Sequence, residues 1–217
     1  MLPRRFLRLT FFIISLFILS CGLPSIALPS PAVPSGTALF KDDFSSASSG
    51  WDHAKYAEGI VDYDGGGYRI LVNALEVNFW ATPHKDFTNV RLEVDAGKLA
   101  GPDNNRLGLV CRSDGKSYYF FLVSSDGYYG MGIFQNGRSS LLGQSTMQAS
   151  EKINTGFAIN HLRADCNHDE LSFYVNGSQL ADVHDPTLLH GDVGILAGTF
   201  DQPGVDIVFD NFIVLQP

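Results

Sequence analysis

The sequence predicts an all-β domain built as a two-sheet antiparallel sandwich. Short runs of alternating apolar residues recur along the chain, turn-forming residues separate nearly all of them, and no stretch has the 3.6-residue apolar period of a helix. Each half-buried sheet needs a second sheet over its apolar face, so many short strands predict a sandwich or barrel. The predicted strands are 68–72, 90–96, 106–112, 117–124, 127–134, 161–166, 171–175, 193–197 and 205–214.

The first element, residues 1–20, has the composition of an export signal. Arg4, Arg5 and Arg8 precede an uncharged apolar run over 9–20. That run is shorter than the roughly 20 apolar residues that a membrane-spanning helix needs. We therefore expect residues 1–20 to direct export and then to be cleaved.

The second element begins at Cys21, where Ile18, Leu19 and Ser20 precede the cysteine. This arrangement resembles the bacterial lipobox, which implies lipidation of Cys21 and attachment to a membrane. The alternative is an ordinary secretory signal cleaved near Ala27. Residues 21–37 are rich in Pro, Ser and small residues, which predicts an extended tether. The third element, residues 38–217, is long enough for a single domain with a sizeable core.

The charge of the exported part argues against a nucleic-acid partner. Without the three signal arginines, 12 basic residues remain against 23 acidic ones, a formal charge of −11. The acidic residues are scattered, as on a solvated surface. Neutral polymers remain possible ligands.

Turn residues define several hairpins within the domain. Asn136-Gly137 and Asn176-Gly177 offer the two consecutive positive-φ positions that two-residue hairpins require. Residues 113–115 and 125–127 supply two further turns, so we expect a meander of short strands. Run 117–124 is apolar at both its odd and even positions, which predicts a central strand covered on both faces.

Cys111 and Cys166 form an even pair in a domain expected to be exported, which predicts a disulfide. Each cysteine shares its strand face with apolar residues, so both thiols should point into the core. We expect the bridge to form if strands 106–112 and 161–166 are neighbours with level ends. The alternative is a pair of separate buried thiols.

Several local motifs together resemble the concanavalin A-like lectin and glucanase superfamily. They are Asp43-Phe44 with the later Trp51, Gly108 to Arg112, Tyr118-Tyr119, Ser125 to Gly130, Asn160 to Arg163, Phe173 to Gly177 and Val208 to Phe212. More narrowly, the chain is similar to laminin-G-like jelly-roll domains of bacterial surface proteins, which are related to keto-disaccharide hydrolase domains. The resemblance spans nearly all of 38–217 and implies a jelly-roll sandwich, in which sugar binding, glycan cleavage and scaffolding all occur.

Glu93 and Asp95 form the candidate catalytic pair, because next-but-one residues on a strand project from the same face. The glucanases of this superfamily carry a third acid in the motif, and here Gly97 and Lys98 occupy its places. The alternative is a charged ladder facing solvent, with Arg112 or Arg163 opposite the two acids.

Sugars stack their apolar C–H faces on aromatic rings and need polar partners for their hydroxyls. Candidate ligand-binding residues are Trp80, Arg112, Tyr119, Tyr129, Arg163 and Tyr174. The competing explanation for each aromatic residue is packing in the core.

A structural calcium ion joins the first and last strands in many jelly rolls of this superfamily, which implies a site at Asp43 and Asp210. An ordinary surface explains these residues equally well. Taken together, the sequence favours a lipid-anchored, extracytoplasmic protein with a non-catalytic carbohydrate-binding or scaffold domain, whose ligand is a glycan or envelope polysaccharide. A glycoside hydrolase of the same fold is the alternative, and a purely structural envelope protein is the third possibility.

Overall fold

The structure is a computed structural model that describes residues 35–217. The predicted signal segment, Cys21 and the tether up to residue 34 lie outside the described residues. Within 35–217 every regular element is a β-strand, and no helix could span a membrane. All nine predicted strands are confirmed. The sixteen strands are β1 (Ala38–Asp42), β2 (Ala54–Tyr56), β3 (Gly59–Asp64), β4 (Gly67–Val72), β5 (Asn78–Ala81), β6 (Val90–Ala100), β7 (Asn105–Ser113), β8 (Tyr118–Val123), β9 (Tyr128–Gln135), β10 (Arg138–Leu141), β11 (Gln148–Ala149), β12 (Asn160–Asn167), β13 (Glu170–Val175), β14 (Ser178–His184), β15 (Asp192–Thr199) and β16 (Val205–Leu215).

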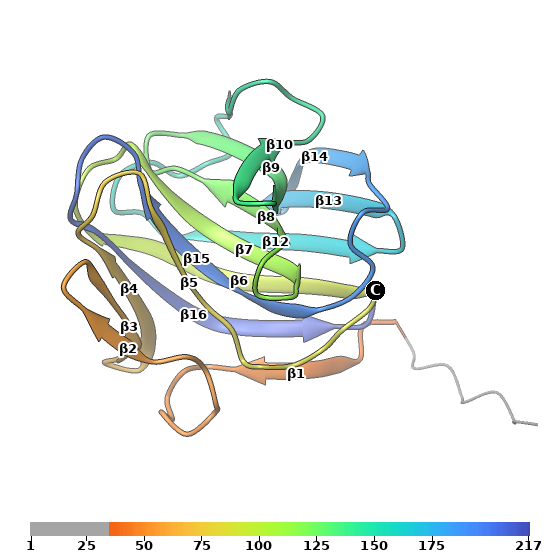
Figure 1. The fold of residues 1–217 in the computed structure, drawn as a ribbon, viewed down its shortest axis with the longest axis horizontal. Coiled ribbons are helices and arrows are strands. Elements are labelled where there is room, and N and C mark those ends of the chain that lie inside the picture. Colours follow the sequence, from red (N-terminus) through yellow and green to blue (C-terminus); the bar gives the residue numbers. More distant parts are fainter. Residues whose placement is uncertain (1–34) are drawn as a thin grey trace, which may run out of the picture. The chain divides into compact units, whose positions relative to one another are not determined.

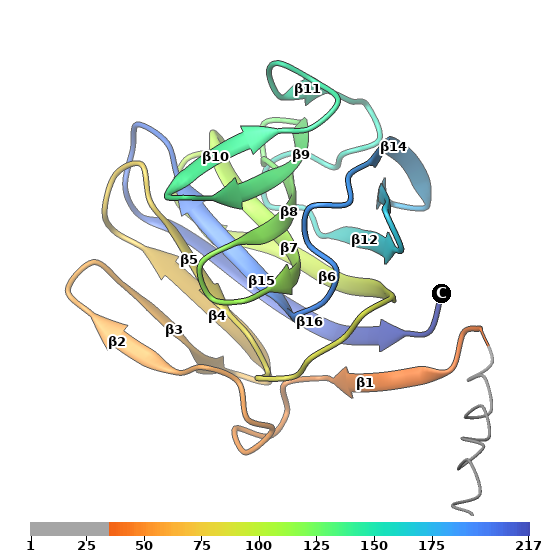
Figure 2. The same ribbon diagram turned by 45° about the vertical axis from the view of Figure 1, so that its right-hand side comes forward.

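The strands form two antiparallel sheets packed face to face, which confirms the predicted sandwich (Figure 1). The nine-stranded sheet has the order β14-β13-β12-β6-β16-β4-β3-β2, and β1 pairs with the carboxyl-terminal half of β16. The seven-stranded sheet has the order β10-β9-β8-β7-β15-β5, and β11 pairs with β9. Figure 2 shows β1 alongside β16, near the carboxyl end of the chain.

The predicted meander is present in two blocks. Strands β7 to β10 are consecutive hairpins in one sheet, and β12 to β14 are consecutive hairpins in the other. Asn136-Gly137 and Asn176-Gly177 connect β9 to β10 and β13 to β14, and all four residues have positive φ, as the two-residue hairpins require. The meander is broken between β6 and β7, which belong to opposite sheets.

The core lies between the two sheets and follows the strand alternation. On β12, Leu162, Ala164 and Cys166 have no exposed surface, whereas the residues between them are partly exposed. An aromatic cluster closes one end of the core, where the Trp51 and Phe212 rings meet edge to face with centroids 4.9 Å apart. The Trp51 indole N–H donates to Asp42 Oδ2 at 2.9 Å, so the buried nitrogen is paired.

The predicted disulfide between Cys111 and Cys166 is confirmed, and its Cα atoms lie 6.9 Å apart. Both sulfur atoms are buried in the core, as expected. The bridge was expected on the condition that strands 106–112 and 161–166 are neighbours, and the structure shows them facing each other across the core rather than paired within one sheet. Cys111 belongs to β7 in the seven-stranded sheet and Cys166 to β12 in the nine-stranded sheet, so the bond joins the two layers across the core.

Strand β8 is buried at every position, which confirms the prediction for run 117–124. Its odd-numbered residues point into the core between the sheets. Its even-numbered residues point to the other face of the seven-stranded sheet, where they pack in a second, smaller cluster. Within residues 35–217 no third layer of strands covers this outer face. The even-numbered side chains of β8 are covered there by neighbouring side chains of the same sheet.

Candidate functional site

Glycines create space on the outer face of the seven-stranded sheet. Five of them lie in the strands beside and beyond β8, where register places them on this face: Gly108, Gly130, Gly132, Gly194 and Gly198. Gly132 lies directly opposite Phe120, and a Cβ atom at Gly132 would stand 2.4 Å from Phe120 Cζ. The large side chains of β8 therefore lie flat across strands that carry no side chain there.

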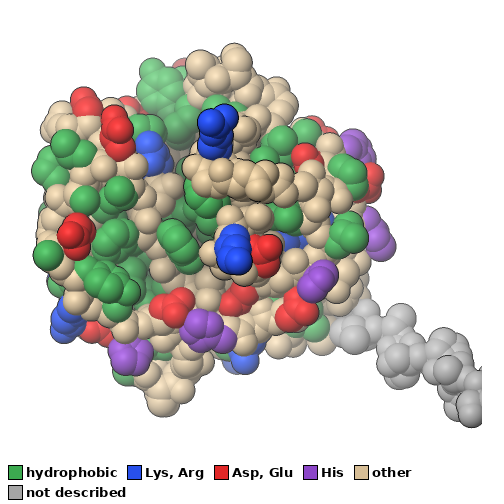
Figure 3. Space-filling model, in the orientation of Figure 1, with side chains coloured by type: hydrophobic (Ala, Val, Ile, Leu, Met, Phe, Trp, Pro, Cys, Tyr) green, Lys and Arg blue, Asp and Glu red, His purple; other side chains and the backbone are tan. Residues whose placement is uncertain are grey.

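Three aromatic rings form a row over these glycines. The centroids of Trp80 and Tyr118 lie 5.8 Å apart, and Tyr118 stacks on Phe134 at 5.1 Å with a 17° angle between the rings. Trp80 is 38% exposed, whereas Tyr118 is nearly covered. This row, with Phe120, Leu122, Leu141 and Phe200, lines a hollow of about 930 Å³ that we call the aromatic cleft. Figure 3 shows hydrophobic side chains gathered on the part of this face where β5 and β15 run.

Polar groups stand at one side of the aromatic cleft. The Arg106 guanidinium lies 4.0 Å above the Phe200 ring and donates through Nη1 to Asn78 Oδ1 at 2.9 Å. Burial lowers the pKa of Arg106 and raises that of the Tyr118 hydroxyl. The cleft thus combines apolar ring faces with a few fixed hydrogen-bonding groups, which is the usual composition of a small-molecule site.

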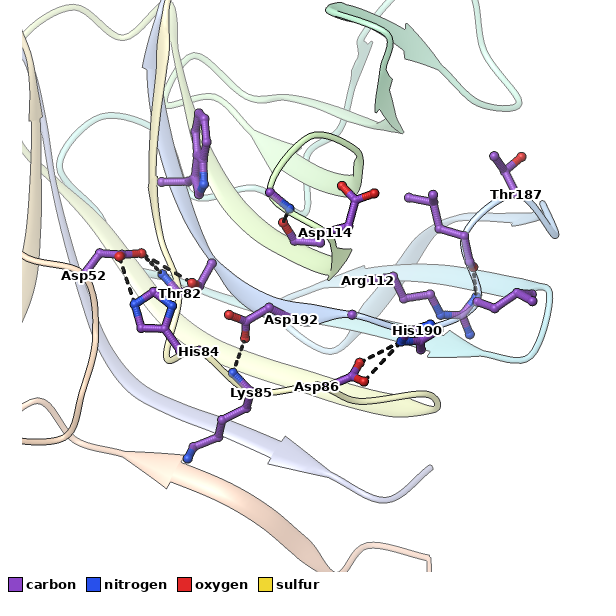
Figure 4. Close-up of a pocket in the computed structure, with 16 residues that line it drawn as sticks. Asp52, Thr82, His84, Lys85, Asp86, Arg112, Asp114, Thr187, His190 and Asp192 are labelled. Carbon is purple, nitrogen blue, oxygen red and sulfur yellow. Dashed lines mark hydrogen bonds and ion pairs between the residues drawn. The ribbon is translucent and has the colours of Figure 1, made fainter.

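A second hollow, of about 820 Å³, adjoins the first at Trp80, which lines both. We call it the polar pocket, and Figure 4 shows its residues. The Asp52 carboxylate lies 3.0 Å from His84 Nε2, and the Asp86 carboxylate lies 2.9 Å from His190 Nδ1. These groups come from the loops at one end of the sheet, so the pocket is lined by more ionisable side chains than the cleft.

Two predicted ligand-binding residues, Arg112 and Tyr119, form hydrogen bonds with the backbone of Leu188, which lines the polar pocket. Arg112 donates to the carbonyl oxygens of Thr88 at 3.2 Å and Leu188 at 2.7 Å. The Tyr119 hydroxyl donates to Asp185 Oδ1 at 2.6 Å and accepts the Leu188 N–H at 3.0 Å. Tyr119 has no exposed surface, so its ring packs in the core rather than presenting a face to a ligand. Arg112 lines the pocket while being 1% exposed.

The remaining predicted ligand-binding residues lie elsewhere. Arg163 and Tyr174 are on the outer face of the nine-stranded sheet, where the Arg163 guanidinium covers the Tyr174 ring at 4.4 Å. Tyr129 is half-buried on β9, packs against the core and borders a separate hollow near Leu180. Of the six predicted residues, Trp80 and Arg112 line one hollow together, while Arg163 and Tyr174 contact each other on the other outer face.

The candidate catalytic pair lies on the outer face of the nine-stranded sheet, away from both hollows. His161 stands between the two acids, with Nδ1 2.8 Å from Asp95 Oδ1 and Nε2 3.5 Å from Glu93 Oε2. Asn211 also donates to Asp95, at 3.0 Å. Arg163 lies opposite Glu93 in the register of β12 and β6, as in the charged-ladder alternative, and its guanidinium forms its ion pair with Asp165. Arg112 does not face these acids, because β7 belongs to the other sheet.

The acids of the predicted calcium site are occupied by local partners. Asp43 accepts hydrogen bonds from the Ser45 amide and hydroxyl, which lower its pKa. Asp210 accepts the Asn211 N–H at 2.6 Å. Among residues 35–217, no three His, Cys, Asp or Glu side chains gather as metal ligands. The arrangement of Asp43 and Asp210 therefore does not fit the implied ion.

Sequence reasoning missed most of the aromatic cleft. Tyr118, Phe120, Phe134 and Arg106 were not among the predicted binding residues. The available signal was the double apolar face of run 117–124 together with glycines in the adjoining runs 106–112 and 127–134. Glycine opposite a large aromatic residue indicates a surface on which that side chain lies flat.

Comparison with known proteins identifies the fold. No protein-family model matches the chain, and no curated protein matches its sequence. The carbohydrate-binding module CBM66 from Bacillus subtilis is 21% identical over 77% of this chain and 96% of that chain, with a TM-score of 0.54. A protein of unknown function with a galectin-like fold from Bacillus subtilis is 12% identical over 84% and 97%, with a TM-score of 0.64. The catalytic domain of an endo-1,3-β-glucanase (laminarinase) from Thermotoga petrophila is 9% identical over 85% and 99%, with a TM-score of 0.59.

At these identities the likeness is one of fold. The domain has the two-sheet jelly-roll fold that these proteins share, as the sequence resemblance implied. Because this fold carries both binding modules and glycanases, activity has to be argued from the site.

Proposed function

We propose that this chain is an exported, lipid-anchored carbohydrate-binding protein that holds a glycan on the outer face of its seven-stranded sheet without cleaving it. The observation that carries the proposal is Trp80, a partly exposed indole at the junction of the aromatic cleft and the polar pocket. A pyranose ring stacked there has apolar surface beneath it and hydrogen-bonding groups on either side.

The placement of the acids favours binding over hydrolysis. Glycoside hydrolysis needs two carboxyl groups flanking the scissile bond. Glu93 and Asp95 lie on the opposite outer face from Trp80, and Asp95 is already bonded to His161 and Asn211. The shared fold of CBM66 agrees with a binding role, and that of the laminarinase keeps the glycosidase as the alternative to be tested.

The anchor is proposed from the sequence. The Ile18-Leu19-Ser20-Cys21 motif supports lipidation of Cys21, and the Pro- and Ser-rich residues that follow would separate the domain from the membrane. In that arrangement the lipid holds the protein outside the cytoplasm and the jelly roll captures envelope or environmental polysaccharide.

Replacement of Trp80 tests the proposal. The purified full chain is titrated with a panel of neutral and acidic oligosaccharides by calorimetry, and bound sugar should shield Trp80 from a soluble fluorescence quencher. The other tryptophan, Trp51, is 2% exposed and serves as an internal reference. We expect Trp80→Ala to weaken binding by roughly 10- to 100-fold, the effect of losing a central aromatic anchor.

The matched control is Phe157→Ala, which removes a strongly exposed ring outside both hollows and should leave affinity unchanged. The same samples are assayed for released sugars. Absence of binding across the panel, or equal loss in both variants, would exclude the proposed site. Hydrolysis that disappears in Glu93→Gln would establish the glycosidase instead.

A further inference from the structure

A third hollow, which we call the edge hollow, lies at the open side of the sandwich where both sheets end. Strand β2 is the last strand of the nine-stranded sheet, β5 is the last strand of the seven-stranded sheet, and β5 contacts β3 and β4 (Figure 2). The edge hollow has a volume of about 440 Å³, and its lining includes Tyr56 of β2 and Trp80 of β5. These are two of the four exposed aromatic side chains in residues 35–217. Exposed rings gathered in one hollow are typical of a binding surface.

Packing supports the Tyr56 ring while leaving most of it open. The rings of Tyr56 and Phe79 meet edge to face, with centroids 5.9 Å apart and an 85° angle between the planes. Phe79 fits in turn over Gly59, the cross-strand partner of Tyr56, where a Cβ atom would stand 2.6 Å from the Phe79 ring. Tyr56 is nevertheless 60% exposed. A ring that is already supported on one side loses little conformational freedom when a ligand stacks on it.

We infer that Tyr56 forms a second sugar-stacking position beside Trp80, so that the protein binds a glycan chain of two or more units rather than a single terminal sugar. This inference rests on the proposed function, because it extends the same site and names the length of glycan that the site takes. The volume of the edge hollow, about 440 Å³, is within the roughly 300–1,000 Å³ of small-molecule sites, so a further sugar ring has room there.

The edge hollow continues the surface on which Trp80 lies. Trp80 lines the aromatic cleft, the polar pocket and the edge hollow, so a sugar stacked on its indole borders all three. The edge hollow shares Asn78 with the aromatic cleft and Asp52 with the polar pocket. His53 adds another polar side chain to its lining. The hydroxyl groups of a second unit would therefore meet polar partners beside the Tyr56 ring, which is the combination that sugars require.

The test measures how affinity depends on chain length in the purified full chain. Each oligosaccharide family of the panel, including β-1,3- and β-1,4-linked gluco-oligosaccharides, is titrated by calorimetry at lengths from a single unit upwards. Members that bind weakly are measured by competition against the longest one. We expect at least one family to gain about tenfold in affinity when the single unit is extended to a trisaccharide, the effect of one further aromatic contact.

Tyr56→Ala should reduce that gain to less than about twofold and leave the affinity for a single unit unchanged, whereas Trp80→Ala should weaken binding at every length. Tyr56→Phe keeps the ring and should retain the gain. The matched control is Tyr128→Ala, which removes another exposed tyrosine outside the three hollows and should also retain it. Because Tyr56 is exposed, its variants should melt at the same temperature as the wild type.

A gain that persists in Tyr56→Ala overturns the inference, and so does an affinity that is independent of length in every family that binds. Both outcomes leave the proposed function standing. Absence of binding at every length in every family removes the proposed function itself.

Discussion

Reduction of the Cys111–Cys166 bond should cost the domain a large part of its stability. The two cysteines are 55 residues apart, and the bond joins one sheet to the other. In the chain-entropy model, closing a loop of this length in the unfolded chain stabilises the folded state by about 4 kcal/mol. For a domain of this size each kcal/mol corresponds to roughly 2–4 °C, so we expect the melting temperature to fall by about 8–16 °C.

Thermal and urea unfolding of a Cys21→Ser protein measure this effect, because Cys111 and Cys166 are then the remaining cysteines. The oxidised and fully reduced proteins are compared, with thiols counted after unfolding. The urea dependence of the unfolding free energy should also steepen on reduction, since an unlinked unfolded chain exposes more surface. A Cys111→Ala/Cys166→Ala protein is the control and should not respond to reductant.

A melting temperature that moves by less than about 2 °C on complete reduction, with two thiols counted, would refute the reasoning. Two thiols found in the unreduced protein would show that the bond does not form.

Three further outcomes are expected. Cys21→Ser should release the protein from membranes. Lipidation would be contradicted if this variant stays membrane-bound and mass spectrometry of the wild type finds no acyl chain. Burial and the Asp185 hydrogen bond raise the pKa of Tyr119 to about 12 from an ordinary value of 10, so the stability it contributes is intact below pH 10 and is lost as pH rises through 12. Tyr119→Phe should reduce the decrease in the urea midpoint that the wild type shows above pH 10. Identical pH profiles in the two proteins would show that Tyr119 ionisation does not cause the decrease. Gly132→Val should destabilise the fold by about 1–3 kcal/mol, because its Cβ would clash with the Ser140 carbonyl oxygen and with the Phe120 ring. In a Gly132→Val/Phe120→Ala protein, the loss of unfolding free energy measured by chemical denaturation should be smaller than the sum of the two single-variant losses. Losses that simply add would show that the Phe120 ring takes no part in the clash.

The fold was largely predictable because strand alternation and turn chemistry agree along the chain. All nine strands predicted from alternation exist, and both Asn-Gly hairpins have the expected backbone. The strands that sequence reasoning missed are short or lie toward the sheet edges, such as β5 and β14, where one face is only partly buried and the apolar period is weak.

The site was much less predictable because sheet membership and facing direction are long-range properties. Tyr118 and Tyr119 are adjacent and chemically alike, yet one lies in the cleft and the other in the core. A shift of one residue exchanges the two faces of a strand, and on β8 both faces are apolar, so the pattern cannot distinguish them. Similarly, nothing local to Cys111 and Cys166 indicates that their strands belong to different sheets.

The pairing of β1 with β16 also determines how the domain carries mechanical load. Force entering at the amino-terminal side reaches β1, whose hydrogen-bond ladder to β16 is extended by Gly36 and Thr37. The load then spreads into the nine-stranded sheet through β16, which also pairs with β6 and β4. Trp80 and its neighbours belong to the other sheet, and the Cys111–Cys166 bond provides a covalent link between the two. Tension on the amino-terminal side therefore enters the nine-stranded sheet first, whereas the proposed glycan-binding surface belongs to the seven-stranded sheet.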